Sequence, residues 1–317
     1  MHISAKCAVR KKPVRILFSI DLGGKILRNV FPKSPKVSIL IPHHRNMSLS
    51  TAQFKLITGG CYLCYMIKNI WIDLDDTLWA TQENNRDTLE ELYHLYGWDR
   101  VYPTFADFFD IYLPNNIHQW DLYRDGKIDK YSLTINRFAP VLEPLGYDSD
   151  EKILELSEEF LERTATKKKV MPGALELMEH LHSLYTIIII SNGFCEVQHR
   201  KMESSGLLAY VDHVILSEDA EAPKPSKRIF DYGFATTGAR RSESILIGDA
   251  WIADIHGAEV AGMPAIWYNP SGTPRPAEEL RTPVYEVRHL RMIPNILRSL
   301  ISLKPHDRRD QRLISKE

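Results

Sequence analysis

The sequence is poor in several features that would place it in a special class of protein. It has four cysteines in 317 residues, a net charge of only −1, and no wholly apolar run that approaches the roughly 20 residues of a membrane-spanning helix. Few cysteines argue against a small disulfide scaffold and are typical of the reducing cytoplasm, where we expect the protein to act. The short apolar runs predict no transmembrane helix, and the near-neutral charge gives no sign of a nucleic-acid partner for the whole chain.

What the sequence does have is the composition of an ordinary folded protein. Hydrophobic residues make up 44% and charged residues 26%, which excludes a fully disordered chain, and the length is sufficient for two domains. The charge is unevenly distributed, however. Residues 1–65 hold eleven lysines and arginines and a single acid, Asp21, whereas the other residues hold 29 basic and 40 acidic side chains.

The basic segment, residues 1–65, does not have the pattern of a folded domain. It contains four prolines and no sustained hydrophobic periodicity. It could be a transit peptide, a basic arm for nucleic acid or membrane surfaces, or a disordered or non-native extension upstream of the real start. We favour the extension, because Met66 begins a run that is typical of a first strand. Residues 66–317 alone are then expected to fold and keep full activity, and loss of activity on removing the segment would contradict this.

The rest of the chain alternates between strand and helix patterns. The β-branched and aliphatic run at residues 186–190 predicts a strand buried on both faces of a sheet. Further strands are expected at residues 70–74, 211–216, 244–247, 265–268 and 285–287. Helices are expected at residues 172–184, 194–205, 226–236, 252–261 and 292–301. This alternation predicts the α/β class, with right-handed crossovers on a doubly wound parallel sheet.

Residues 81–168 interrupt this alternation, because they show helical spacing and no strong strand signal. Residues 148–150 provide a helix N-cap ahead of a helix at 150–163. Other helices are expected at 87–95 and 128–142, with breaks at Gly97, Pro114, Gly126 and Gly146. We therefore predict an α/β core from residues 66–80 and 169–302, an inserted helical-bundle cap at 81–168, and a charged tail at 303–317.

Polar residues that could carry chemistry follow the strands of the predicted core. They are Asp73, Asp75 and Thr77 after the first strand, Ser191 and Asn192 after the second, Lys224 after the third, and Asp249 and Asp254 after the fourth. Because ligands bind beyond the carboxyl ends of parallel strands, we expect these side chains to meet at one edge of the sheet. Asp73 and Asp75 are two positions apart and can point to the same side. Two such carboxylates repel unless a hard cation such as Mg²⁺ neutralises them.

These motifs resemble the four motifs of the haloacid dehalogenase superfamily, over about residues 66–300. The matching residues are Asp73-x-Asp75-x-Thr77, Ser191-Asn192 after an apolar run, Lys224 before a helix, and Gly248-Asp249 followed by Asp254. The helical insertion resembles the C1 type of cap, and residues 73–80 and 191–194 are most similar to the pyrimidine 5′-nucleotidase branch. The dehalogenases of the superfamily lack the second aspartate, so the presence of Asp75 favours a phosphate substrate over a carbon–halogen bond.

The resemblance implies a Mg²⁺-dependent phosphomonoester hydrolase that forms an aspartyl phosphate, a 5′-nucleotidase for pyrimidine nucleoside monophosphates. Asp73 would be the nucleophile and Asp75 the general acid and base. The Asp73 carboxylate, the Asp75 backbone carbonyl and Asp249 would bind the metal, with Asp254 orienting a metal-bound water. Phosphate-binding residues would be Ser191, Asn192, Lys224 and Thr77. A sugar-phosphate or phosphoglycolate phosphatase, a phosphomutase, and a catalytically silent scaffold remain open as alternatives.

Specificity is expected to come from the cap, which would exclude water from the reacting phosphate. The candidate substrate residues are Trp79, Asn84, Asn116, Trp120 and Arg137. An aromatic ring among them could stack on a base and an amide could read its edge, but each could equally be a core or ion-pair residue. We expect a small phosphorylated metabolite as the partner, no nucleic acid, no membrane, and a monomer or homodimer.

Overall fold

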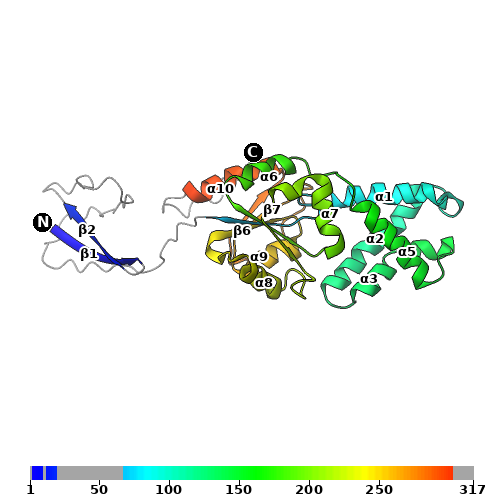
Figure 1. The fold of residues 1–317 in the computed structure, drawn as a ribbon, viewed down its shortest axis with the longest axis horizontal. Helices are drawn as coiled ribbons and strands as arrows, with labels where there is room; N and C mark the ends of the chain where they lie inside the picture. The colour runs from blue at the N-terminus through cyan, green and yellow to red at the C-terminus, as the bar shows by residue number, and fades with distance from the viewer. Residues whose placement is uncertain (1, 10–11, 20–66, 303–317) are drawn as a thin grey trace. The chain divides into compact units, whose positions relative to one another are not determined.

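The computed structural model describes residues 2–9, 12–19 and 67–302 (Figure 1). The chain divides into two units, Met1–Cys61 and Tyr62–Glu317. In the first unit, β1 (His2–Val9) pairs antiparallel with β2 (Lys12–Ser19). Most of the predicted basic extension, residues 1–65, lies outside the described residues. The predicted charged tail, residues 303–317, lies wholly outside them. Both therefore stay predictions.

A parallel sheet of six strands forms the centre of the second unit, in the order β5-β4-β3-β6-β7-β8. The strands are β3 (Asn69–Ile72), β4 (Thr186–Ser191), β5 (His213–Leu216), β6 (Ser244–Gly248), β7 (Ala265–Tyr268) and β8 (Val284–Val287). β3 is the first strand of this sheet along the chain, and it lies between β4 and β6. The chain therefore adds β4 and β5 on one side of β3 and then β6, β7 and β8 on the other. This confirms the predicted α/β class with a doubly wound parallel sheet.

Helices cover both faces of this sheet (Figure 1). They are α6 (Ala174–His182), α7 (Cys195–Ser205) and α10 (Ile293–Ser302) on one face, and α8 (Lys227–Thr237) and α9 (Gly257–Ala261) on the other. The strand residues alternate between these two layers: Ile187 and Ile189 of β4 pack in the first, Ile188 and Ile190 in the second. Short 3₁₀ turns complete the core at η3 (Leu207–Tyr210), η4 (Arg241–Glu243) and η6 (Leu290–Met292).

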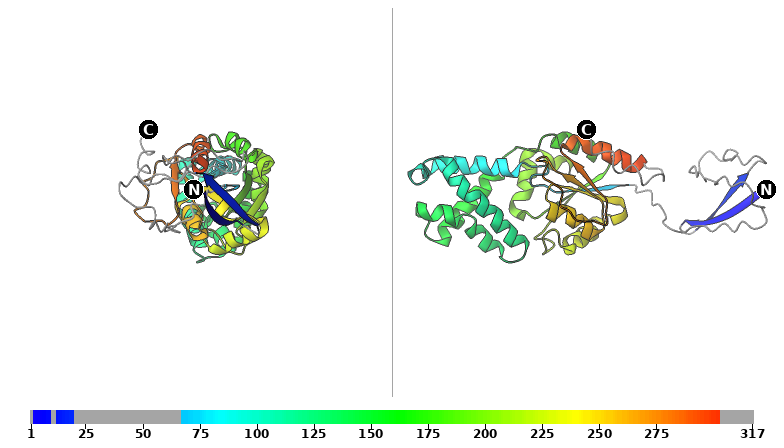
Figure 2. Two further views of the ribbon diagram at one scale, coloured as in Figure 1. Left: turned by 90° about the vertical axis from the view of Figure 1, so that its left-hand side faces the viewer. Right: turned by 180° about the vertical axis from the view of Figure 1, so that it is seen from behind.

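Between β3 and β4, the chain forms a separate helical layer at one end of the sheet, cyan to green in Figure 2. Its elements are α1 (Thr81–Leu95), η1 (Trp98–Arg100), α2 (Phe105–Arg124), α3 (Lys130–Asn136), α4 (Ala139–Leu142), η2 (Glu143–Leu145) and α5 (Asp150–Thr164). These inserted helices have their own core of aromatic and aliphatic side chains, built around Trp98, Phe108 and Phe138. The predicted N-cap is confirmed, because the Ser149 hydroxyl accepts a hydrogen bond from the backbone N–H of Lys152.

The expected break at Pro114 is wrong, because Pro114 lies inside α2. A proline removes one backbone donor and leaves the carbonyl four residues earlier, at Asp110, without its usual partner. Pro114 and Asp110 are both exposed, so water can satisfy that carbonyl. A capping box at the start of α2, formed by Thr104 and Asp107, helps to stabilise the long helix.

The two connections between sheet and inserted helices are paired with each other. Trp79 forms a β-bridge with Val170, the Ala80 N–H donates to the Lys169 carbonyl, and the Met171 N–H donates to the Leu78 carbonyl. The chain therefore enters and leaves the insertion through one hydrogen-bonded ribbon.

The helix expected at 252–261 begins instead with a π-helical turn, η5 (Trp251–His256), and continues as α9. The wider turn brings Asp254 back over the end of β6, where Oδ2 accepts from the Ala250 N–H at 3.0 Å. The approach requires glycine at 248, because a Cβ there would lie 2.3 Å from the Asp254 carboxylate. Among the described residues, we find no helix with the length and apolarity to span a membrane.

Candidate active site

Asp73 directly follows β3 at the carboxyl edge of the sheet. Its N–H still donates to the Ile247 carbonyl at 2.9 Å, which ties the start of the loop to β6. The loop then turns sharply: Asp76 has a φ of 60°, and its N–H donates to the Trp79 carbonyl. This turn brings the carboxylates of Asp73 and Asp75 into the same cavity.

Lys224 is buried between two carboxylates, with only 2% of its surface exposed. Its Nζ lies 2.5 Å from Asp73 Oδ1, 2.7 Å from Asp254 Oδ1 and 2.9 Å from the Ile190 carbonyl. The Asn192 side chain fixes the backbone of Lys224 from both sides, donating to its carbonyl and accepting from its N–H. Asn192, a predicted phosphate ligand, thus uses its side chain to place the lysine, and its backbone N–H remains available to a phosphate.

Three carboxylates crowd around this lysine. One oxygen each of Asp73, Asp249 and Asp254 lies within 4.8 Å of the others. Burial, reinforced by the Asp254 charge, raises the pKa of Asp249 to about 7. Burial also raises the pKa of Asp73 well above its usual value, against the lowering effect of Lys224. The cluster therefore holds more negative charge than one ammonium group neutralises, and a hard divalent cation with oxygen ligands fits it.

Thr77 does not take the phosphate-binding position that the sequence predicted. Its side chain is fully buried, it does not line the cavity, and its hydroxyl donates to Asp249 Oδ1 at 2.9 Å while it accepts from the Asp249 N–H at 3.0 Å. Both hydrogen-bonding directions of the hydroxyl are thus occupied by one residue. Thr77 orients Asp249, and because its single proton is used, the hydroxyl has none left to donate to a phosphate oxygen.

Asp75 is held by three side chains that sequence reasoning missed. Lys201 Nζ lies 2.8 Å from Oδ1, Gln198 donates to Oδ2 at 2.7 Å, and Thr81 donates to Oδ1 at 2.7 Å. Burial alone would raise the pKa of Asp75, but the Lys201 charge and these hydrogen bonds lower it below its usual value. The available signal was the i, i+3 spacing of Gln198 and Lys201, which puts two polar residues on one face of a core helix.

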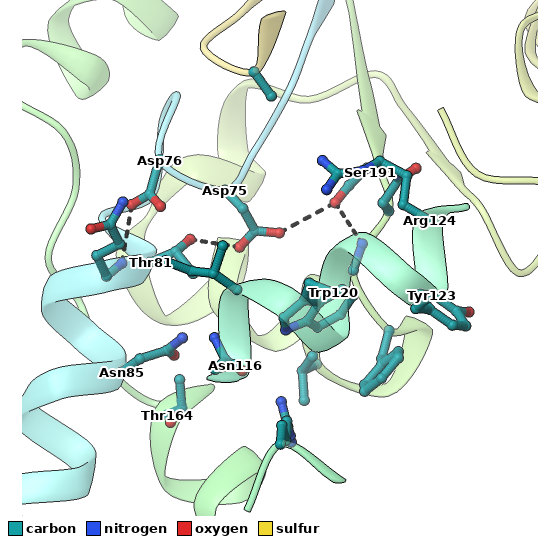
Figure 3. Close-up of a pocket in the computed structure, with 18 of the residues that line it drawn as sticks. Asp75, Asp76, Thr81, Asn85, Asn116, Trp120, Tyr123, Arg124, Thr164 and Ser191 are labelled. Atoms are coloured by element: carbon teal, nitrogen blue, oxygen red, sulfur yellow. Dashed lines mark hydrogen bonds between the residues drawn. The ribbon is translucent and has the colours of Figure 1, made fainter. Parts of the chain in front are cut away.

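Ser191 joins this group at the end of β4. Its hydroxyl accepts from the Gly193 N–H at 3.0 Å and from Gln198 at 2.6 Å, and it donates to Asp75 Oδ2 at 3.4 Å (Figure 3). The hydroxyl and the Asp75 carboxylate are therefore neighbours on the wall of one cavity.

The cavity measures about 490 Å³, in the range of small-molecule sites. Asp73, Asp75, Ser191, Lys224 and Asp249 line its sheet end. The inserted helices supply much of the remaining wall, in which aromatic and apolar side chains alternate with polar ones, and include three of the predicted substrate residues: Asn116, Trp120 and Arg137. Residues of the core such as Phe194 and Lys201 complete it.

Two other predicted substrate residues do not line this cavity. Trp79 is fully buried in the core of the sheet, and its indole N–H donates to the Lys167 carbonyl. Asn84 is also fully buried, with its amide bonded to the backbone of Lys169. Both residues brace the ribbon that connects sheet and insertion. Their roles depend on a pairing between distant segments, which their own neighbourhood in the sequence does not reveal.

A buried lysine among carboxylates at the carboxyl edge of a doubly wound parallel sheet, beneath an inserted helical layer, is the fold and site of a hydrolase of the haloacid dehalogenase type. Residues 67–262 match the family model described as haloacid dehalogenase-like hydrolase. The chain belongs to this family, as the sequence motifs predicted.

Three curated relatives show what kinds of enzyme the chain is similar to. The HAD-hydrolase YfnB of Bacillus subtilis is 29% identical over 73% of this chain and 95% of YfnB. The pyrimidine 5′-nucleotidase YjjG of Escherichia coli is 32% identical over 63% of this chain and 85% of YjjG. The pyrimidine 5′-nucleotidase PynA of Streptococcus pneumoniae is 30% identical over 51% of this chain and 68% of PynA. Together with the family match, these relatives identify the protein as a phosphatase of the haloacid dehalogenase type.

A solved structure agrees with the fold. YfnB bound to magnesium, in a crystal form that reveals interdomain movement, matches with a TM-score of 0.65 and 27% identity, covering 73% of this chain and 98% of that one.

Proposed function

We propose that this phosphatase is a Mg²⁺-dependent hydrolase of pyrimidine nucleoside 5′-monophosphates that works through an aspartyl phosphate. Asp73 is the nucleophile, and Asp75 is the general acid and base. Asp73, the Asp75 carbonyl and Asp249 bind the metal, while Asp254, whose two oxygens are already bonded to Lys224 and to the Ala250 N–H, acts from outside that group.

The observation that carries the chemistry is the position of Lys224 between Asp73 and Asp254. The ammonium holds the Asp73 carboxylate near Asp249, on a cavity that Ser191 also lines. Bound Mg²⁺ would supply the positive charge that lets a phosphate dianion approach these carboxylates. Lys224 would add a second positive charge against the phosphoryl oxygens, as phosphoryl transfer requires.

Proton transfer falls to Asp75. In the first step it gives a proton to the leaving oxygen, and in the second it takes one from the water that attacks the aspartyl phosphate. Lys201, Gln198 and Thr81 fix the carboxylate at the cavity wall, so that both steps use the same position.

The pyrimidine nucleotide is supported by the walls of the cavity and by two relatives. Trp120, Tyr123 and Phe194 form a cluster of rings that lines the cavity, with Trp120 and Phe194 centroids 5.3 Å apart, and such faces favour a flat base. YjjG and PynA carry the name of this activity, at 32% and 30% identity.

The chemistry is tested with Asp73→Asn, which removes the nucleophile and keeps the size of the side chain. We expect turnover to fall by at least a thousandfold while the thermal unfolding curve stays cooperative. Near-normal turnover would remove Asp73 from the nucleophile role.

The substrate is tested by comparing kcat/KM for UMP, CMP, AMP, ribose 5-phosphate and phosphoglycolate. The proposal expects the two pyrimidine nucleotides to lead. A clear preference for either of the last two would replace the nucleotidase with a sugar-phosphate or phosphoglycolate phosphatase.

A further inference from the structure

Arg137 is a buried cation without a counter-charge. It follows α3, lines the cavity, and is only 3% exposed. Its Nη2 donates to the neutral Ser157 hydroxyl at 3.0 Å, and its Nε has no hydrogen-bond partner. Among the described residues, no carboxylate forms an ion pair with it. Its guanidinium lies over the rings of Phe138 and Phe160 at 4.7 and 5.5 Å, which offsets only part of the cost of burying the charge.

A second unsatisfied group lies on the wall of the same cavity. Thr164, at the end of α5, is buried, and its hydroxyl has no partner. In Figure 3, Thr164 and Asn116 lie on the side of the cavity away from Asp75 and Ser191. Arg137 contacts the same helix through Ser157 and Phe160, so both unsatisfied donors lie along α5, whereas the carboxylates and Lys224 lie at the edge of the sheet.

Buried polar groups are nearly always hydrogen-bonded, so two unsatisfied donors beside one helix, both in residues that line the cavity, require an explanation. Neither is the remnant of a disrupted helix or loop, since both sit in well-packed helical surroundings. A substrate with a hydrogen-bond acceptor beside them would satisfy them. Leaving these donors unpaired costs free energy in the free enzyme. A substrate that pairs them removes this cost and a substrate without the acceptor does not, so the site would select for the acceptor.

The chemistry of the walls distinguishes between acceptors. A second phosphate or a carboxylate would lie against Phe109, Phe160 and Leu161, which cannot solvate the anionic oxygens that Arg137 leaves uncovered. A flat ring with an exocyclic carbonyl places its faces on the aromatic walls and presents one neutral acceptor to the guanidinium. Both uracil and cytosine have such a carbonyl next to the ribose-bearing nitrogen, whereas adenine has none.

Resting on the proposed function, we propose that Arg137 and Thr164 recognise a ring carbonyl of the substrate's base and so select pyrimidine nucleotides over adenine nucleotides. Arg137 has no part in the phosphoryl chemistry. It is a specificity residue on the inserted helices, where it follows α3, whereas Asp73 lies at the edge of the sheet.

The experiment measures binding in the Asp73→Asn protein with MgCl₂, by calorimetry, so that hydrolysis does not interfere. UMP is compared with ribose 5-phosphate, which has the same phosphate and sugar but no base, and with AMP. We expect UMP to bind at least tenfold more tightly than either. Adding Arg137→Met is expected to remove most of that ratio and to affect ribose 5-phosphate far less.

Thr164→Val provides a milder second variant, because it keeps the shape of the side chain and removes only the hydroxyl. It should lower the ratio several-fold. Arg163→Met, on a partly exposed arginine of the same helix, is the matched control and should leave the ratio unchanged.

Two results would overturn the inference: a UMP to ribose 5-phosphate ratio that neither variant changes, or tighter binding of fructose 1,6-bisphosphate than of UMP, which would assign this part of the cavity to an anion. Failure of the proposed function is a separate result. It would appear as wild-type enzyme that hydrolyses no pyrimidine monophosphate with Mg²⁺, whatever the binding ratio.

Discussion

The ammonium group of Lys201 lies 2.8 Å from Oδ1 of Asp75, although 126 positions separate the two residues in the sequence. Lys201 is only 7% exposed, and its Nζ also lies 4.6 Å from the centre of the Trp79 ring. Lys201 therefore packs against Trp79, in the ribbon at the base of the inserted helices. At the same time it binds the carboxylate of Asp75, the proposed general acid and base.

We expect Lys201→Met to lower kcat at least tenfold. Without the ammonium, burial would raise the pKa of Asp75, and its carboxylate would lose one of the four side chains that donate to it. The acid limb of the pH–rate profile should then shift to higher pH. The control is Lys168→Met, since Lys168 is exposed and outside the cavity. Equal activity of the two variants would show that Lys201 serves stability alone.

Thr77→Val tests the orientation of Asp249. The substitution keeps the shape of a fully buried side chain but removes both hydrogen bonds to Asp249. Losing one partner that orients a metal ligand typically costs about 10–100-fold in metal affinity or activity. We expect the Mg²⁺ concentration for half-maximal activity to rise by about that factor. Thr77→Ser, which retains the hydroxyl, should recover most of the loss; if it does not, the hydroxyl is not what Asp249 needs.

Removal of divalent cations should abolish hydrolysis, and MgCl₂ should restore it. Burial, reinforced by the Asp254 charge, raises the pKa of Asp249 to about 7, and a bound cation would offset both effects, so Mg²⁺ should also raise the unfolding temperature by several degrees. Asp249→Asn should lose that increase, whereas Asp148→Asn, on an exposed carboxylate, should keep it. Hydrolysis that continues undiminished in excess chelator would contradict a role for the metal.

Lys130 joins the inserted helices to the core. Its Nζ lies 2.8 Å from Glu196 and 2.8 Å from Glu218, and 4.3 Å from the centre of the Phe194 ring. We expect Lys130→Met to loosen this contact and raise KM by about fivefold. This corresponds to a loss of about 1 kcal/mol in the free energy of substrate binding. Faster cleavage by a protease at the α2–α3 connection would report the opening directly. Lys127→Met, on an exposed lysine paired only within its own loop, should change neither measurement.

Glu259 gives a stability that depends on pH. Four hydrogen bonds from Arg281 and Thr282 reach its carboxylate. Burial alone would raise the pKa of Glu259, but these bonds, with those to Thr282 the strongest, lower it from 4.5 to about 2. A lowered pKa in the folded state means that the stabilisation is complete above about pH 4.5 and is lost as the pH falls toward 2.

Glu259→Gln should therefore lower the free energy of unfolding at pH 7 by about 2 kcal/mol. The difference from wild type should shrink between pH 4.5 and 2, as measured by urea denaturation. A difference that stays constant over this range would show that the charge of Glu259 is not what stabilises the loop.

Much of the core could be predicted from the sequence, since its strands are short apolar runs ended by acids or hydroxyls. Residues 186–190, for example, can hardly form anything but a doubly buried strand, and Asp73, Asp249 and Lys224 meet because parallel strands share one carboxyl edge. The N-cap at Ser149 was likewise a local signal, which depends on residues three positions apart.

The parts that could not be predicted depend on contacts between distant segments. Thr77 looks like a phosphate ligand until the pairing of β3 with β6 brings Asp249 against its hydroxyl. The role of Lys201 depends on which face of α7 meets Asp75, and the continuation of α2 through Pro114 depends on solvent around one carbonyl. Local patterns carry none of this information.

The paired ribbon formed by residues 78–80 and 169–171 has an evolutionary consequence. Both junctions of the insertion lie side by side and are hydrogen-bonded to each other. The loop that carries Asp73 and Asp75 therefore ends in this ribbon before the inserted helices begin. A differently shaped insertion could replace the present one beyond the ribbon without moving the reactive groups. Such an arrangement would let new substrates be acquired by exchanging one contiguous stretch of gene, while the phosphate chemistry is inherited intact.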